Sequence, residues 1–217
     1  MSDGIRLVCF DWGGVILKHC RAWSEACTLA GLPIREGVDS HDKVLRRREA
    51  TAAFQRGHMA SDDYYRALAQ ASDWLYSTSE IKRLHDAWVT EEYPGVADVI
   101  HAIHANNRDT ALLSNTNEAH WRRHLPGPRG EKPDFPTAGL LRMRFGSHQL
   151  GLVKPGIEIY RAFERHTRHE GERILFFDDL IGNINAARSI GWNAELIDHT
   201  GDTAHQLRTH LTNHGVL

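Results

Sequence analysis

The apolar positions of the chain fall into short runs that alternate with helical stretches. Runs rich in β-branched and aromatic residues predict buried strands at residues 5–10, 109–115, 173–179 and 193–198, with a weaker one within 138–147. Apolar residues at helical spacing predict helices at residues 94–107, 154–169, 180–191 and 201–215. This alternation predicts an α/β fold, in which helices cover both faces of a parallel sheet.

The pattern changes between the first and the second predicted strand. Residues 18–92 contain about four amphipathic segments and no strand-like run, with turn signals such as Gly57 between them. Because this helical block interrupts the strand–helix rhythm, we expect an inserted cap over one edge of the sheet. The predicted organisation is a core of residues 1–17 and 93–217 and a helical cap of residues 18–92.

Polar residues stand where three of the predicted strands end. Asp11 ends the first strand, and Ser114 and Asn115 end the second. Asp178 and Asp179 end the third. Ligands of open parallel sheets bind beyond the carboxyl ends of the strands, so we expect these side chains to meet. Each residue alone has a plainer interpretation as a turn or helix-capping residue, but their shared placement favours a site.

Three carboxylates close together in a partly buried cleft require a compensating cation. Mg²⁺ is the natural candidate, because it binds carboxylate and carbonyl oxygens and keeps waters and a phosphate as further ligands. Ser114 and the following amides could hold phosphate oxygens, and Lys154 could add positive charge. A carboxylate at a strand end is also a suitable nucleophile for a phosphoryl group.

Composition and charge limit the classes of partner. The 217 residues are enough for one sizeable core, or for a core with a small subdomain. A formal net charge of −2 gives no indication of a nucleic-acid partner. No apolar run reaches the roughly 18 residues that span a bilayer, and the first residues lack a signal-peptide pattern. We therefore expect no membrane partner and a cytoplasmic location, whereas the oligomeric state cannot be read from the sequence.

The spacing of the cysteines and histidines indicates neither a CxxC motif nor a zinc site. The three cysteines, Cys9, Cys20 and Cys27, show no CxxC spacing, and an odd number is typical of a reducing compartment. His120 and His124 have the spacing of a zinc-binding pair, but no HExxH glutamate or third ligand accompanies them. We interpret them as solvated histidines on a helix face.

Four segments resemble, in order, the motifs of the haloacid dehalogenase-like superfamily. They are "FDWGGV" at residues 10–15, "LLSNTN" at 112–117, "LVKP" at 152–155 and "FFDDLIGNINAAR" at 176–188. The similarity covers nearly the whole chain, and the helical block stands where the superfamily places its C1 cap. The chain looks closest to the group that contains bacterial α-glucose-1-phosphate phosphatase and the N-terminal phosphatase domain of soluble epoxide hydrolases. This resemblance implies a Rossmann-like core and a Mg²⁺-dependent phosphatase acting on a small phosphorylated metabolite, such as a sugar phosphate.

The resemblance also implies roles for individual residues of the catalytic and substrate-binding machinery. Asp11 would be the nucleophile and a metal ligand. Ser114, with Asn115 beside it, would bind the phosphoryl oxygens. Lys154 would neutralise charge on the nucleophile and on the phosphate.

The remaining metal-binding roles fall on the third motif strand and on the turn after the nucleophile. Asp179 would be the direct ligand of the acidic pair, with Asp178 acting through water. Asn183 would support the pair from outside the first coordination shell. The backbone carbonyl of Gly13 could also bind the metal, because that contact needs no side chain.

Gly13 departs from the pattern of most phosphatases in the superfamily. Their aspartate two residues after the nucleophile protonates the leaving group and later activates water, work that contributes about 10²–10⁴-fold in rate. Here that position carries no side chain, and the sequence shows no other residue that would evidently transfer the proton. A good leaving group, such as an anomeric phosphate, or a cap residue such as His58 could lessen the need for it.

Two other functions remain open at this point. A dehalogenase would attack carbon and need no acidic group at position 13, although the Asp178-Asp179 pair favours a divalent metal. A catalytically weak relative would bind a phosphorylated ligand or a protein partner.

The cap sets substrate identity in such a fold, and the sequence offers several candidates there. Basic residues that could reach a phosphosugar are Arg46, Arg47, Arg48, Arg56 and His58. A solvated basic helix face is an equally good interpretation of each.

Overall fold

The computed structural model describes residues 4–217, so residues 1–3 of the predicted core lie outside it. Five strands form one sheet in the order β5-β4-β1-β6-β7, and all neighbours are parallel. Their bounds are Leu7–Phe10 for β1, Asp109–Ser114 for β4, Met143–Gly146 for β5, Ile174–Asp178 for β6 and Asn193–Leu196 for β7. The predicted α/β fold with a parallel sheet is confirmed.

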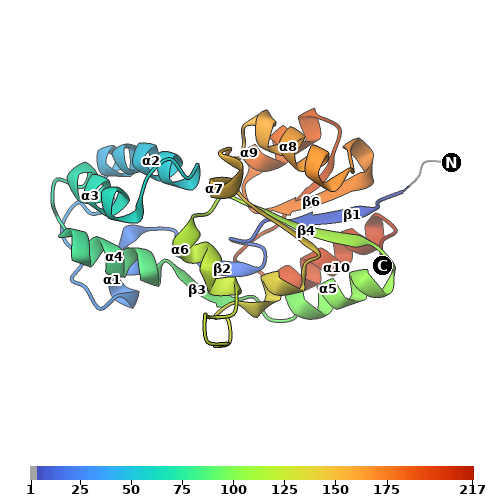
Figure 1. The fold of residues 1–217 in the computed structure, drawn as a ribbon, viewed down its shortest axis with the longest axis horizontal. Helices are drawn as coiled ribbons and strands as arrows, with labels where there is room; N and C mark the ends of the chain where they lie inside the picture. Colours follow the sequence, from blue (N-terminus) through green and yellow to red (C-terminus); the bar gives the residue numbers. More distant parts are fainter. Residues whose placement is uncertain (1–3) are drawn as a thin grey trace.

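Helices cover both faces of this sheet (Figure 1). The helices α8 (Ile157–Thr167) and α9 (Ile181–Ser189) lie on one face. The helices α5 (Val96–Ala105) and α10 (Thr203–Asn213) lie on the other. Successive strand residues point to opposite faces, and the core accordingly divides into two buried clusters. In β1, Val8 belongs to the cluster with α5 and α10, whereas Cys9 belongs to the cluster with α8.

Four helices form a separate body at one end of the molecule (Figure 1). They are α1 (Trp23–Leu29), α2 (His41–Gln55), α3 (Ser61–Ala71) and α4 (Thr78–Ala87). They enclose their own buried cluster, in which the rings of Phe54 and Tyr64 stack with centroids 4.0 Å apart. We call these four helices the cap, because the site described below lies between them and the sheet.

Two short strands connect the cap to the sheet, and the sequence prediction of an all-helical block is wrong there. Strand β2 (Leu17–His19) pairs antiparallel with β3 (Val89–Glu92). Helix α4 ends at Ala87, before this strand. Val89 and Thr90 are β-branched and favour the extended conformation, and pairing with β2 gives their backbone hydrogen bonds that a helix end would lack.

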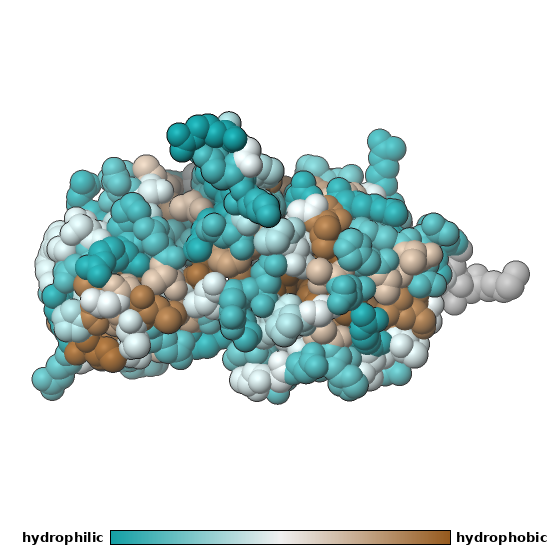
Figure 2. All heavy atoms as spheres, turned by 90° about the horizontal axis from the view of Figure 1, so that it is seen from below, coloured by the Kyte–Doolittle hydropathy of each residue, from teal (hydrophilic) through white to brown (hydrophobic). Residues whose placement is uncertain are grey.

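The remaining elements are short and lie between β4 and β6. They are α6 (Glu118–Trp121), α7 (Ser147–Leu150) and the 3₁₀ helices η1 (Arg122–His124), η2 (Pro136–Leu140) and η3 (Gly171–Arg173). The face of the molecule in Figure 2 is mostly hydrophilic, with smaller apolar patches over the cap and the core. Within residues 4–217, no helix combines the length and the apolar character that a membrane span requires. The three cysteines are buried free thiols.

Candidate active site

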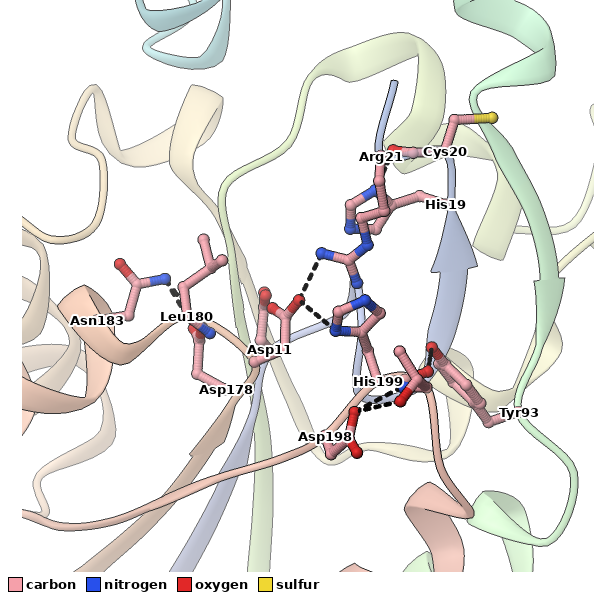
Figure 3. Close-up of polar contacts among 12 residues, drawn as sticks. Asp11, His19, Cys20, Arg21, Tyr93, Asp178, Leu180, Asn183, Asp198 and His199 are labelled. Atoms are coloured by element: carbon pink, nitrogen blue, oxygen red, sulfur yellow. Dashed lines mark hydrogen bonds and ion pairs between the residues drawn. The ribbon is translucent and has the colours of Figure 1, made fainter. Parts of the chain in front are cut away.

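The three strand ends that the sequence singled out lie side by side at the carboxyl edge of the sheet, and the ends of β1 and β6 are drawn in Figure 3. Strand β1 lies between β4 and β6, so Asp11, which follows β1, is central. Its amide donates a hydrogen bond to the carbonyl of Phe177 at 2.8 Å, which places it beside Asp178 at the end of β6. Ser114 ends β4 on the other side and is buried.

Lys154 lies between two of the carboxylates. Its Nζ is 2.9 Å from Oδ1 of Asp11 and 2.6 Å from Oδ2 of Asp178, and its side chain is 1% exposed. Asn115 fixes the lysine backbone at both polar groups: its Nδ2 donates to the carbonyl of Lys154 at 2.8 Å, and its Oδ1 accepts from the amide at 2.9 Å. The side chain of Asn115 therefore positions Lys154, and any substrate contact from this residue would have to come from its backbone.

Burial and neighbouring charges have opposite effects on the pKa values of Asp11 and Lys154. Burial raises the pKa of Asp11 above its usual range; the Lys154 ammonium opposes this shift, and the carboxylate of Asp178 adds to it. Burial lowers the pKa of Lys154, but the charges of Asp11 and Asp178 outweigh burial and hold that pKa above its usual value. The lysine is therefore a fixed cation between two carboxylates.

Asp178 is fully buried, and both of its oxygens already have partners. Asn183 Nδ2 lies 3.0 Å from each oxygen, and the amide of Leu180 donates to Oδ1 at 2.8 Å. Tyr160 in turn donates to the carbonyl of Asn183 at 3.0 Å, so α9 is tied to α8 behind the site. Lys154 also donates to Oδ2, so Asp178 connects Lys154 with Leu180 and Asn183 through hydrogen bonds.

Asp179 faces the segment around β2. Its Oδ2 is 2.6 Å from Nη1 of Arg21 and 3.9 Å from Nδ1 of His199, and Figure 3 shows Arg21 and His199 converging on the acidic edge. Gly14 makes this approach possible, since it has φ +78° and a Cβ built on it would lie 2.4 Å from Cγ of Asp179. Only glycine combines this left-handed backbone with so close a carboxylate.

The three carboxylates form a donor set that suits a hard divalent cation. One oxygen from each of Asp11, Asp178 and Asp179 lies within 4.8 Å of the others, and no other such cluster occurs among residues 4–217. All donors are oxygens, as Mg²⁺ prefers. Side-chain cations balance part of their charge, since Lys154 contacts Asp11 and Asp178 and Arg21 contacts Asp179. The residues present therefore fit Mg²⁺.

A cavity of about 580 Å³ opens from this edge toward the cap. Its core side includes the predicted residues Asp11, Gly13, Ser114, Asn115, Lys154, Asp179 and Asn183. Its cap side is largely apolar and aromatic, with Trp23, Phe54, Tyr64, Leu68, Leu84 and Trp88. The cavity can therefore hold a small molecule that has one anionic end and one less polar end.

Comparisons with known proteins agree with this geometry. The model of the haloacid dehalogenase-like hydrolase family matches residues 5–191. The chain is a haloacid dehalogenase-like hydrolase. Its fold is similar to that of a haloacid dehalogenase family enzyme from Bacteroides thetaiotaomicron, with a TM-score of 0.75 at 17% identity over 95% of this chain and 100% of that one.

Two further solved structures show how widely this hydrolase's fold is shared. A predicted haloacid dehalogenase-like hydrolase from Porphyromonas gingivalis has a TM-score of 0.71 at 20% identity, over 95% of this chain and 98% of that one. The L-2-haloacid dehalogenase from Xanthobacter autotrophicus has a TM-score of 0.63 at 17% identity, over 98% and 84%. At these identities the likeness concerns the fold alone. The closer resemblance to glucose-1-phosphate and epoxide hydrolase phosphatases stays a prediction.

The basic cap residues of this haloacid dehalogenase-like hydrolase divide into two groups. Arg47 and Arg48 line the cavity, whereas Arg46, Arg56 and His58 do not. Arg47 is buried, lies 3.9 Å over the ring of Trp23 and donates to the carbonyl of Val38 at 2.8 Å. Of the two interpretations left open, the solvated face is wrong for Arg47, whose stem and charge are buried in the cap interior.

His58 does not replace the acidic group missing at Gly13, because it is exposed and lies outside the cavity wall. The interpretation of His120 and His124 as solvated is also wrong, because both are buried. His120 stacks on His85 of the cap with centroids 4.0 Å apart, and its Nε2 lies 2.8 Å from the carbonyl of His85. These rings join the cap to the core.

The sequence analysis missed two polar residues of the cavity wall beside the acidic edge, His19 and Arg21. Both lie in or just after β2, in the segment assigned to the helical block. The cavity is lined by Leu17 and by every residue from His19 to Trp23, so the lining positions have no period of two that the sequence could have revealed.

Proposed function

We propose that this hydrolase cleaves small phosphomonoesters, with Asp11 as the nucleophile and Mg²⁺ as the cofactor. The observation that carries the proposal is the position of Lys154 between Asp11 and Asp178, with Asp179 beside them. A fixed cation next to a nucleophilic carboxylate neutralises charge that builds up when a phosphate dianion approaches it. The Bacteroides thetaiotaomicron enzyme has been solved in a complex with magnesium and inorganic phosphate, which agrees with this chemistry.

The reaction divides into two displacements at phosphorus. In the first, a carboxylate oxygen of Asp11 forms a bond to phosphorus while the bond from phosphorus to the leaving oxygen breaks. In the second, water attacks the aspartyl-phosphate, which releases phosphate and restores the carboxylate. Ser114 would donate to a phosphoryl oxygen, and Lys154 would balance charge in both steps.

Asp11 and Asp179, with the Gly13 carbonyl, would hold Mg²⁺, while Asp178 would support them through water. Bound there, Mg²⁺ supplies positive charge against the phosphoryl oxygens. Arg21 would have to share Asp179 with the ion or leave it.

A dehalogenase and a protein that only binds phosphate, the two alternative functions, would each need a different set of residues at this site. Displacement of a halide from carbon builds no charge on a phosphoryl group and gives no reason for three clustered carboxylates. A protein that only binds phosphate needs no nucleophile beside its lysine. The cluster of Asp11, Asp178, Asp179 and Lys154 is therefore best explained by phosphoryl transfer.

A substrate panel tests the proposal. The panel contains glucose 1-phosphate, p-nitrophenyl phosphate, benzyl phosphate and 2-chloropropionate, each with and without Mg²⁺. We expect phosphate release that requires Mg²⁺, is lost in Asp11→Asn and persists in Asp98→Asn, a matched change at an exposed aspartate of α5. Metal-independent chloride release would replace the proposal with the dehalogenase. Phosphate-induced stabilisation without turnover would replace it with the binding protein.

A further inference from the structure

The side chain of His19 fills the space where residue 13 would have a side chain. A Cβ built on Gly13 would lie 2.8 Å from Cδ2 and 3.1 Å from Nε2 of His19. The three heavy atoms nearest to that Cβ position, apart from chain neighbours, all belong to this one imidazole. Position 13 has no side chain, and the imidazole of His19 occupies the place where one would lie.

The path of the chain explains how His19 returns to Gly13. After Asp11 the chain turns at Gly14, and the amide of Leu17 donates to the carbonyl of Trp12 at 2.8 Å. Gly13 forms a bridge with Leu17, which starts β2. His19 is two residues further along, after a shift in the register of β2, and its ring lies against Gly13.

The ring of His19 is held in a defined orientation. Its Nδ1 lies 2.8 Å from the carbonyl of Cys20, which can only accept, so Nδ1 carries a hydrogen. One face of the ring stacks on Trp88 of the cap, with centroids 6.5 Å apart and planes 20° from parallel. This leaves Nε2, the atom nearer to Gly13, as the nitrogen that can gain and lose a proton.

His19 shares its cavity with the nucleophile and with the charged groups of the metal-binding edge. The cavity wall contains His19, Asp11 and Asp179, with Arg21 two residues from His19 (Figure 3). The wall also contains His85 and His120. His120 has Nε2 on the carbonyl of His85 and Nδ1 3.3 Å from the side-chain amide of Asn117, and the His85 ring stacks on that of His120.

We propose that His19 is the general acid and base of this hydrolase and takes the role that an aspartate at position 13 has in its relatives. The inference rests on the proposed phosphatase function and deepens it. As the bond between phosphorus and the leaving oxygen breaks, protonated Nε2 gives its proton to that oxygen and becomes neutral. Neutral Nε2 then accepts a proton from the water that attacks the aspartyl-phosphate, which returns His19 to its starting state.

The experiment compares two phosphomonoesters of similar size. The leaving group of p-nitrophenyl phosphate is stable as an anion, whereas that of benzyl phosphate is an alkoxide that needs a proton. The variants are His19→Ala and His19→Gln, with His58→Ala as the control at an exposed histidine outside the cavity. We expect kcat/KM, which reports the step that releases the leaving group, to fall by about 10²–10⁴-fold for benzyl phosphate in both His19 variants, with a much smaller loss for p-nitrophenyl phosphate.

Retained turnover of p-nitrophenyl phosphate also shows that the variants are folded and that Asp11 still acts. Equal losses of kcat/KM on the two substrates in variants with the unfolding temperature of the wild type, or no loss on either, would overturn the role of His19. Failure of the wild type on both esters would instead reject the phosphatase function itself. The two failures are therefore distinguishable.

Discussion

The ammonium of Lys154 lies 2.9 Å from Oδ1 of Asp11 and 2.6 Å from Oδ2 of Asp178, and all three side chains are almost fully removed from solvent. Removing the lysine would leave two buried carboxylates without their cation. We expect Lys154→Met to lower the free energy of unfolding by about 3–5 kcal/mol, measured by urea denaturation without Mg²⁺.

Lys18→Met is the control for this change, because Lys18 pairs with Glu91 at the surface and should contribute at most about 1 kcal/mol. An equally small effect of Lys154→Met would mean that the two carboxylates do not depend on the lysine.

The stacked pair of His85 and His120 makes the cap–core contact sensitive to acid. Burial lowers the pKa of His85 to about 2 and that of His120 to about 4. Below pH 6.5 these two histidines bind protons in the unfolded chain but stay neutral in the folded chain. The free energy of unfolding therefore falls as the pH falls. Each histidine should remove about 1.5 kcal/mol from the free energy of unfolding between pH 6.5 and 5.

Urea denaturation at a series of pH values measures this loss. His120→Gln should weaken the pH dependence by one histidine's share, whereas the same change at the exposed His58 should leave it unchanged. Equal pH dependence of the wild type and His120→Gln between pH 6.5 and 5 would contradict a buried neutral ring at His120.

Gly14 allows the chain to pass against the carboxylate of Asp179. Gly14→Ala would combine an unfavourable φ of +78° with a Cβ 2.4 Å from Cγ of Asp179. We expect the variant to lose stability and to bind Mg²⁺ more weakly, because Asp179 must move. Gly130→Ala has a similar φ of +83° with nothing within 4 Å, so it should lose only the roughly 1–2 kcal/mol of the backbone conformation.

Calorimetric titration of Mg²⁺ and urea denaturation of both variants separate the two effects. If Gly14→Ala behaves like Gly130→Ala in both measurements, the contact with Asp179 has no role in the metal site.

Arg21 competes with a divalent cation for Asp179. Its Nη1 lies 2.6 Å from Oδ2, and its side chain is 31% exposed, so the pair is partly screened by solvent. We expect Arg21→Met to bind Mg²⁺ several-fold more tightly in a calorimetric titration, because the carboxylates lose a compensating charge. An unchanged or weaker affinity would show that the arginine does not oppose the metal.

The strand ends of the site were predictable because β1, β4 and β6 are almost entirely buried and a polar residue stands at or just after the end of each. A parallel sheet brings such ends to one edge whatever the connections between them. Asp11, Ser114 and Asp178 were therefore placed correctly without any knowledge of loops or cap. Lys154 was found through its motif, but its central position between two carboxylates depends on the backbone contacts with Asn115.

His19 and the histidine stack could not be foreseen for a common reason. Strand β2 has three residues, and its partner β3 begins about seventy residues later. His120 lies in a single helical turn, and the ring that buries it comes from α4, 35 residues earlier. Burial that depends on such distant partners leaves no periodic pattern in the local sequence.

The central claim is that Asp11 becomes phosphorylated during turnover. Wild-type protein is mixed with p-nitrophenyl phosphate and Mg²⁺, quenched in acid and digested, and the peptide that contains Asp11 is examined by mass spectrometry. We predict the added mass of one phosphoryl group on that peptide, absent in Asp11→Asn. Hydrolysis that proceeds without this mass on the Asp11 peptide, or with it on another residue, would contradict the account.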